Sequence, residues 1–422
     1  MNNRLNYINQ PSLQAFRQPV VNQFHRTTFD IATRSTPSFS RTMEIGRQIA
    51  EKGSDPVAAL RDFHQRELVR ISGFFKSSGE AIETSRQLSD LRKALVIQLF
   101  HLAARENQGD LALAIGGSVV RGDHTGLTDA EVVIIPADKA DRPAAKRVQA
   151  LMTRNMRAIF LEPDEAMAYH FDANTLESLG PRFTPTTRKE ITDPFLASMR
   201  LSNGFVLSFL MDLQIIGTSG KIAADIYRRK LSALQVNVLY SRHQAFFEMC
   251  QDMYEAKTRE TKEGAGQAFN IKNEALKPFY NALYATRVKL HLADPSPWNT
   301  LQALQEHGLI SAAEKVKCEE ALGFFIVLRH LISFSVFNAE DSAHLTETAL
   351  LPLVRHLRIS KETLQKQLEI HTRSLREISE RILDQAGGGN VALPINTQHG
   401  PGNAPGIPTA PQPHSRPGGK LR

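Results

Sequence analysis

The sequence predicts an α+β protein in which helices precede a small mixed sheet and an all-helical bundle follows it. Apolar residues recur at helical spacing from Met43 to Asn107, short apolar runs typical of strands come next, and helical spacing returns from Ser241 to Asp384. The chain therefore divides into N-terminal helices (43–108), a sheet-containing core (109–240) and a helical bundle (241–385).

Two tails flank this body, and together they carry the whole net charge of the chain. The chain of 422 residues has a formal net charge of +7, of which residues 1–42 hold +4 and residues 386–422 hold +3. The first tail is rich in Asn, Gln, Ser, Thr and Arg and the second in Gly and Pro, so we predict that both are disordered. The body is formally neutral, which argues against a basic groove and hence against a polymerase that uses a nucleic-acid template.

Cysteine use and hydropathy predict where the protein resides. The most apolar stretch, Ala321 to Phe337, has Arg329 and His330 at its middle, which predicts a buried helix rather than a membrane span. Cys250 and Cys318 form no CxxC pair, so neither a disulfide framework nor a thiolate zinc site is indicated. A cytoplasmic location is expected, and export through a secretion signal in the basic first tail is the alternative.

Each predicted element has its own signal. Asp55 and Pro56 predict a helix start, and a second helix follows. Leu111–Ile115 and Val132–Ile135 are short apolar runs that predict strands joined by a glycine-rich turn. The apolar positions that mark the two early helices and the last helix of the bundle are Ala59, Leu60, Phe63, Leu68 and Ile71; Leu88, Leu91, Leu95, Leu99 and Leu102; and Leu364, Leu368, Leu375, Ile378 and Ile382.

The turn Gly116-Gly117-Ser118 directly follows the first predicted strand. Two glycines let the backbone turn sharply and approach a ligand, and Ser118 offers both a hydroxyl and an amide to a phosphate oxygen. The turn is therefore a candidate phosphate cradle, with an ordinary chain reversal as the alternative.

Three carboxylates are candidate metal ligands. Asp129 and Glu131 stand two residues apart at the start of the second strand, so their side chains share one face and lie roughly 7 Å apart at Cα, which suits shared Mg²⁺ ions. Asp212 lies in an apolar run, where an ionised carboxylate costs several kcal/mol unless a cation or hydrogen-bond donors meet it. For Asp129 a solvated strand edge is the alternative, and for Asp212 a salt bridge to an arginine.

Taken together, these residues resemble a known family. The segment from Gly117 to Glu131, followed by an apolar strand, is similar to the nucleotidyltransferase core of the DNA polymerase beta superfamily. It is more closely similar to the bacterial signal-transduction nucleotidyltransferases related to the PII-protein uridylyltransferase. The spacing of that family is kept, but Asp123 stands where it has Glu, and Glu131 where it has its second Asp. The residues that carry the resemblance are Gly117, Ser118, Arg121, Asp123, Thr125, Thr128, Asp129 and Glu131.

The resemblance extends to both sides of this motif, over roughly residues 80–385. Asp212–Gly217 looks like the family's Asp-Leu-Arg-Pro-Val-x-Gly segment, with Gln214 in place of Arg. Asn270–Pro278, followed by Tyr284, Arg287 and Leu290, looks like the start of the family's helical substrate-binding domain, and Leu328-Arg329-His330 matches a later helix of it.

The resemblance implies a reaction in which NTP·Mg²⁺ (or Mn²⁺) loses pyrophosphate while a nucleoside monophosphate passes to a hydroxyl of a protein or small-molecule acceptor, as in uridylyl- or adenylyltransferases. Gly117 and Ser118 would hold the phosphates, and Arg121 and Lys272 would be further phosphate partners. Asp129, Glu131 and Asp212 would bind the metal.

Two residues of the motif keep a structural alternative. Arg121 is equally well read as a brace that pairs with Asp123, and His124 as a polar loop residue. For the whole chain, the alternative is a catalytically silent nucleotidyltransferase fold that acts as a binding module, including a secreted bacterial effector.

Overall fold

The computed structural model describes residues 37–52, 54–126, 132–137, 140–160, 212–221, 269–290, 295–335, 344–345 and 347–387, with scattered residues between 224 and 259 and residue 292. The segments predicted to be disordered tails lie almost entirely outside these residues. At the amino end, however, the first described helix, α2 (Pro37–Lys52), begins inside the segment 1–42 that was assigned to the tail.

The predicted N-terminal helices are present as α3 (Pro56–Ser78) and α4 (Ala81–Arg105). The carboxylate of Asp55 caps α3 by accepting the backbone N–H of Ala58 at 3.0 Å, and Pro56 occupies the first helical turn, where its missing N–H costs nothing. Gly79, with φ of 69°, ends the helix and donates its N–H to the carbonyl of Phe75.

A three-stranded sheet forms from β1 (Leu111–Ile115), β2 (Val132–Pro136) and β3 (Gln214–Ser219) in the order β2-β1-β3. The two predicted strands are thus confirmed, with β1 at the centre and buried along its whole length. Both neighbours run antiparallel to β1, so the described strands do not form the mixed sheet that we predicted. The chain leaves β1 after Ile115 and re-enters the sheet at Val132, its register partner, and this return to the same end forces the opposite direction.

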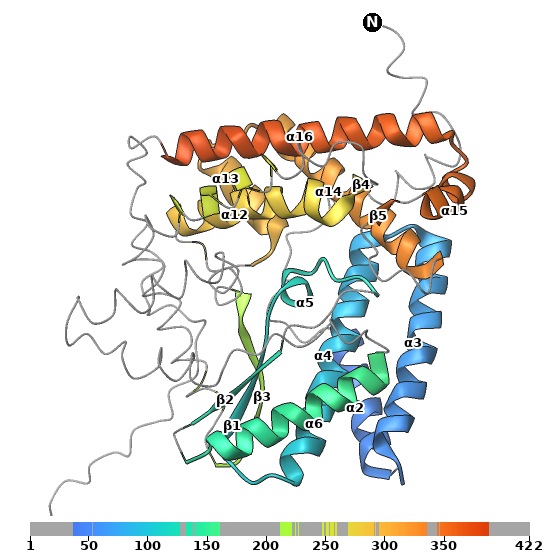
Figure 1. Ribbon diagram of the computed structural model, residues 1–422, viewed down its shortest axis with the longest axis vertical. Helices are drawn as coiled ribbons and strands as arrows, with labels where there is room; N and C mark the ends of the chain where they lie inside the picture. The colour runs from blue at the N-terminus through green and yellow to red at the C-terminus, as the bar shows by residue number, and fades with distance from the viewer. Residues whose placement is uncertain are drawn as a thin grey trace, which may run out of the picture. The chain divides into compact units, whose positions relative to one another are not determined.

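Helices α4 and α6 (Arg142–Phe160) pack beside this sheet, and α3 packs against both of them. Helix α4 is buried on most of its surface because it contacts β1 and β3 as well as α14 (Ala312–Ser335) of the bundle. Figure 1 shows α4 rising from the sheet toward the bundle. This helix therefore ties the sheet to the C-terminal helices.

The bundle begins with a short strand and a π-helical turn and ends with a long helix. The last helix, α16, runs along α12 and α14 (Figure 1), and all five of its predicted apolar positions are buried. The elements are β4 (Phe269–Asn270), η2 (Ile271–Leu276), α12 (Lys277–Lys289), α13 (Pro297–Glu306), α14 (Ala312–Ser335), β5 (His344–Leu345), α15 (Glu347–Leu357) and α16 (Lys361–Gly387).

The apolar stretch with Arg329 and His330 at its middle is helix α14, and both of these side chains are buried, as predicted. Among the described residues, none of the helices combines the length and apolar character that crossing a membrane requires.

Candidate active site

The candidate site starts where β1 ends. Gly117 has φ of 65° and ψ of −146°, a conformation that is essentially restricted to glycine. It turns the chain directly into α5 (Ser118–Arg121), a single helical turn that Gly122 closes by donating its N–H to the carbonyl of Ser118. The predicted glycine turn is therefore present, with Ser118 as its first helical residue.

The strand register brings the flanks of the three candidate carboxylates to this same end of the sheet. Ile115 pairs with Val132 on one side and with Gln214 on the other. Asp129 and Glu131 lie outside the described residues, but Glu131 directly precedes Val132 in the chain, and Asp212 precedes Gln214 by two positions. The arrangement of the strands therefore agrees with a site that combines residues 129, 131 and 212, and the side-chain positions of residues 129 and 131 remain a prediction.

Asp212 is buried and is held by side chains from two other elements. Its Oδ1 accepts a hydrogen bond from Nη1 of Arg287 at 2.9 Å, and its Oδ2 faces Nη1 of Arg121 at 3.3 Å. The hydroxyl of Tyr284 also donates to Oδ2. Of the two partners that the sequence allowed for this carboxylate, a cation or an arginine, the structure shows arginines.

Arg121 connects this cluster to Asp123. Its Nε lies 3.3 Å from Oδ1 of Asp123, whose Oδ2 accepts the hydroxyl of Tyr280 at 2.5 Å. The guanidinium carbon also lies 5.0 Å from the centre of the Tyr280 ring, within range of a cation–π contact. Arg121 therefore braces the loop through Asp123, the structural alternative, while it also reaches Asp212.

Two tyrosines and an arginine of this cluster were not assigned to the site from the sequence. Tyr280, Tyr284 and Arg287 follow one another at steps of four and three on α12, so they share one helix face. Burial, followed by the Asp212 carboxylate, raises the pKa of Tyr284, so its hydroxyl keeps its proton at neutral pH and acts as a donor. Two tyrosines and an arginine at helical spacing, on a face that they share, are the signal that could have identified them.

Ser118 is engaged by a histidine. Its Oγ lies 3.1 Å from Nδ1 of His124, and the His124 side chain is buried rather than exposed as a polar loop residue. Burial, and then the positive charges of Arg92 and Arg329, lowers the pKa of His124 well below its ordinary value, so the ring is neutral. His124 therefore lies in a loop, as predicted, but this part of the loop is buried.

Lys272 lies in the π-helix η2, where Asn270 caps the turn by accepting the N–H of Asn273. Its side chain is half-buried, and it is not one of the described residues that line the pocket beside Asp212. Its predicted role as a phosphate partner therefore stays a prediction.

The segment that contains the glycine turn matches a known protein family. Residues 67–162 match the family described as Putative nucleotidyltransferase DUF294. The predicted resemblance to a nucleotidyltransferase family is thereby confirmed. The matched segment runs from α3 to α6 and includes Gly117, Ser118 and both candidate ligands Asp129 and Glu131, whereas Asp212 and α12 lie beyond it. No curated protein matches the chain.

A backbone substitution tests the glycine turn. Replacing Gly117 by alanine is expected to lower the free energy of unfolding by about 1–3 kcal/mol, because a Cβ atom is strained at this φ and ψ. The matched control is Gly73→Ala in the exposed face of α3, where nothing lies within 4 Å of an added Cβ. It should raise the stability by up to about 1 kcal/mol. Urea unfolding measures both, and effects of the same sign would contradict this conformation.

Buried histidines predict instability in acid. Burial is the main cause that lowers the pKa of His64 and of His330 from 6.5 to about 3. The unfolded chain then binds more protons than the native chain between these values, so stability is fully present above about pH 6.5 and is lost as the pH falls toward 3. Each histidine contributes roughly 1 kcal/mol per pH unit over this window.

Urea unfolding at about pH 7, 6 and 5 checks this dependence. His330→Gln should reduce the slope of unfolding free energy against pH, whereas His307→Gln, at an exposed position after α13, should leave it unchanged. A flat profile between pH 7 and 5 would show that the buried histidines take up protons without cost.

Proposed function

We propose that this chain is a nucleotidyltransferase that moves a nucleoside monophosphate from an NTP to a hydroxyl group of a protein or small-molecule acceptor and releases pyrophosphate. The observation that carries the proposal is the family match over residues 67–162, which contains the glycine turn at the end of β1. The strand register supports it, since it brings the flanks of residues 131 and 212 to that turn.

The proposal includes Mg²⁺ or Mn²⁺, with Asp129, Glu131 and Asp212 as its ligands. Three carboxylates form a hard oxygen donor set of the kind that Mg²⁺ prefers. Within the described residues no three His, Cys, Asp or Glu side chains gather as metal ligands would, and two of the three proposed ligands lie outside that part of the chain. Asp212 fits the set on one condition: a donor from Arg121, Arg287 or Tyr284 must first turn away from its oxygens.

In this proposal each residue of the site has a distinct task. The backbone N–H groups that follow Gly117 bind phosphate oxygens of the donor, and the hydroxyl of Ser118, oriented by His124, adds another contact. Asp129 and Glu131 would hold the metal, and Asp212 would either complete its ligand shell or accept the proton of the acceptor hydroxyl. A bound divalent ion supplies charge neutralisation for the attacking oxygen and the leaving pyrophosphate.

A silent binding module is the second candidate, and one observation favours it. Both oxygens of Asp212 already have donors, which is the arrangement of a structural ion pair. A secreted effector of this kind would use the first tail, residues 1–42, of which residues 1–36 lie outside the described part of the chain.

Pyrophosphate release separates the two candidates. The full-length chain is incubated with each NTP, Mg²⁺ or Mn²⁺, and cell extract divided into protein and small-molecule fractions as sources of acceptor. Release that requires the metal and one of the fractions supports the transferase and shows which class the acceptor belongs to. Binding of an NTP without release from either fraction would favour the module.

A further inference from the structure

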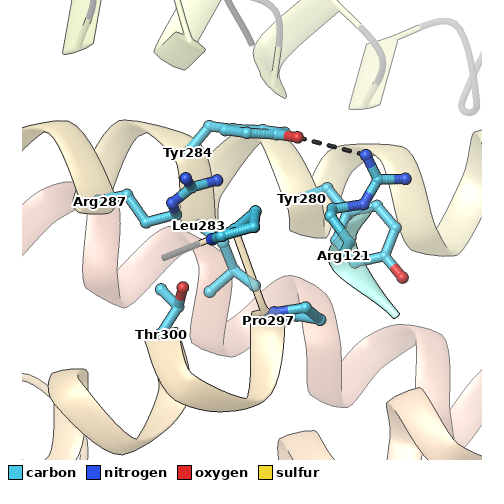
Figure 2. A pocket seen from close by; sticks show the side chains of 8 residues that line it. Arg121, Tyr280, Leu283, Tyr284, Arg287, Pro297 and Thr300 are labelled. Carbon is cyan, nitrogen blue, oxygen red and sulfur yellow. Dashed lines mark hydrogen bonds between the residues drawn. The ribbon is translucent and has the colours of Figure 1, made fainter. Parts of the chain in front are cut away.

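A small pocket lies beside the Asp212 cluster, between α5 and the helices α12 and α13. Figure 2 shows the guanidinium of Arg121 and the hydroxyl of Tyr284 pointing toward one another at the edge of this pocket. The residues that line it are Arg121, Tyr280, Leu283, Tyr284, Arg287, Pro295, Pro297 and Thr300.

The lining contains two charged side chains, Arg121 and Arg287, and the carboxylate of Asp212 is the counter-ion of both. Arg287 and Arg121 lie 2.9 and 3.3 Å from the two oxygens of Asp212, whose side chain is 0% exposed. Two guanidinium groups and a tyrosine hydroxyl thus converge on one carboxylate. Arginine guanidinium groups and hydroxyl groups are also the donors with which proteins bind the oxygens of phosphate.

The surroundings strengthen electrostatic interactions in the pocket. Leu283, Pro295 and Pro297 contribute apolar walls, which lower the local dielectric constant. Asp123 partly balances Arg121 from the opposite side, so the four charged groups sum to zero while Asp212 is ionised. An anion that replaces Asp212 as the partner of the arginines therefore meets both of them across little screening water.

We propose that this pocket is a phosphate-binding subsite in which the carboxylate of Asp212 stands in for the phosphate until the ligand arrives. The phosphate takes over the donors of Arg121, Arg287 and Tyr284, and Asp212 is thereby released for the role given above. The inference rests on the proposed nucleotidyl transfer for its ligand, a phosphate group of either the NTP or a phosphorylated acceptor. The helical bundle then supplies two of these three donors, Tyr284 and Arg287, through α12.

The test measures binding of tripolyphosphate and of inorganic phosphate to the full-length chain by isothermal titration calorimetry, in EDTA so that no metal contributes. Asp212→Asn removes the resident charge with little change of shape, and we expect tripolyphosphate to bind at least about tenfold more tightly. Arg287→Lys keeps the charge but loses the planar fork, and should bind about tenfold more weakly. Asp62→Asn, an exposed aspartate of α3, is the control and should match the unchanged chain.

Equal affinities for Asp212→Asn and the unchanged chain, or no binding to either, would overturn the subsite. Because Arg287→Lys preserves the charge balance, it keeps the proposal testable even where the loss of Asp212 prevents folding.

Competition with an NTP shows the source of the phosphate. Displacement of inorganic phosphate assigns the subsite to the donor, and binding of inorganic phosphate alongside a saturating NTP assigns it to the acceptor. Phosphate binding without pyrophosphate release would support the subsite and overturn the transferase, and the converse result would do the opposite.

Discussion

Replacing Arg287 by glutamine is expected to lower the free energy of unfolding by about 3 kcal/mol. The side chains of Arg287 and Asp212 are 4% and 0% exposed, so the substitution leaves a buried carboxylate with weaker partners, and breaking such a pair costs about 3–5 kcal/mol. The remaining contacts of Asp212 with Arg121 and Tyr284 place the effect near the lower end. Urea unfolding monitored by circular dichroism measures the difference.

A surface arginine serves as the control. Arg47 on α2 pairs with Glu44 and Glu51, but its side chain is 52% exposed, so Arg47→Gln should leave the stability close to that of the unchanged chain. Combining Arg287→Gln with Asp212→Asn removes both charges, and the double variant should be more stable than the sum of the single effects predicts. Strict additivity would show that the two side chains do not stabilise one another.

The largest expected effect on activity comes from Asp129. Asp129→Asn removes one of the proposed metal-binding carboxylates while preserving the size of the side chain, and we expect nucleotidyl transfer to fall by about 10³-fold or more, since a lost charge at the metal removes stabilisation of the transition state. Steady-state pyrophosphate release in saturating Mg²⁺ measures the effect.

Two control measurements show whether a loss of activity in Asp129→Asn is specific to this carboxylate. Asp62→Asn in α3 makes the same chemical change at an exposed position and should retain full activity. The thermal unfolding temperature of Asp129→Asn should stay close to that of the unchanged chain, because the substitution preserves the size of the side chain. Full activity of Asp129→Asn would place the chemistry on other residues.

Periodicity and capping predicted the helices and the first two strands because both signals are local. Asp55 caps α3 as expected, β1 and β2 coincide with their apolar runs, and the predicted apolar positions of α16 are buried. The start of α2 at Pro37 was missed because the residues around it are polar, although proline is well suited to the first turn of a helix.

The contacts of the site could not be predicted in the same way because they join distant parts of the chain. Arg287 and Asp212 are 75 residues apart, and no periodic pattern specifies which arginine meets a buried aspartate. His124 shows the same limit, since its burial depends on helices that pack around the loop and not on its neighbours in sequence. What the sequence did indicate for Asp212 was the need for a partner, because a charge in an apolar run requires one.

The measurement that tests the central claim most directly uses NTPs labelled at either the α- or the γ-phosphate. The full-length chain is incubated with each label, Mg²⁺ and an acceptor-containing extract. Nucleotidyl transfer predicts that the α-label becomes attached to an acceptor and that the γ-label leaves as pyrophosphate in equal amount, both only while Asp129 is present. Transfer of the γ-label, or α-label transfer that persists in Asp129→Asn, would contradict it.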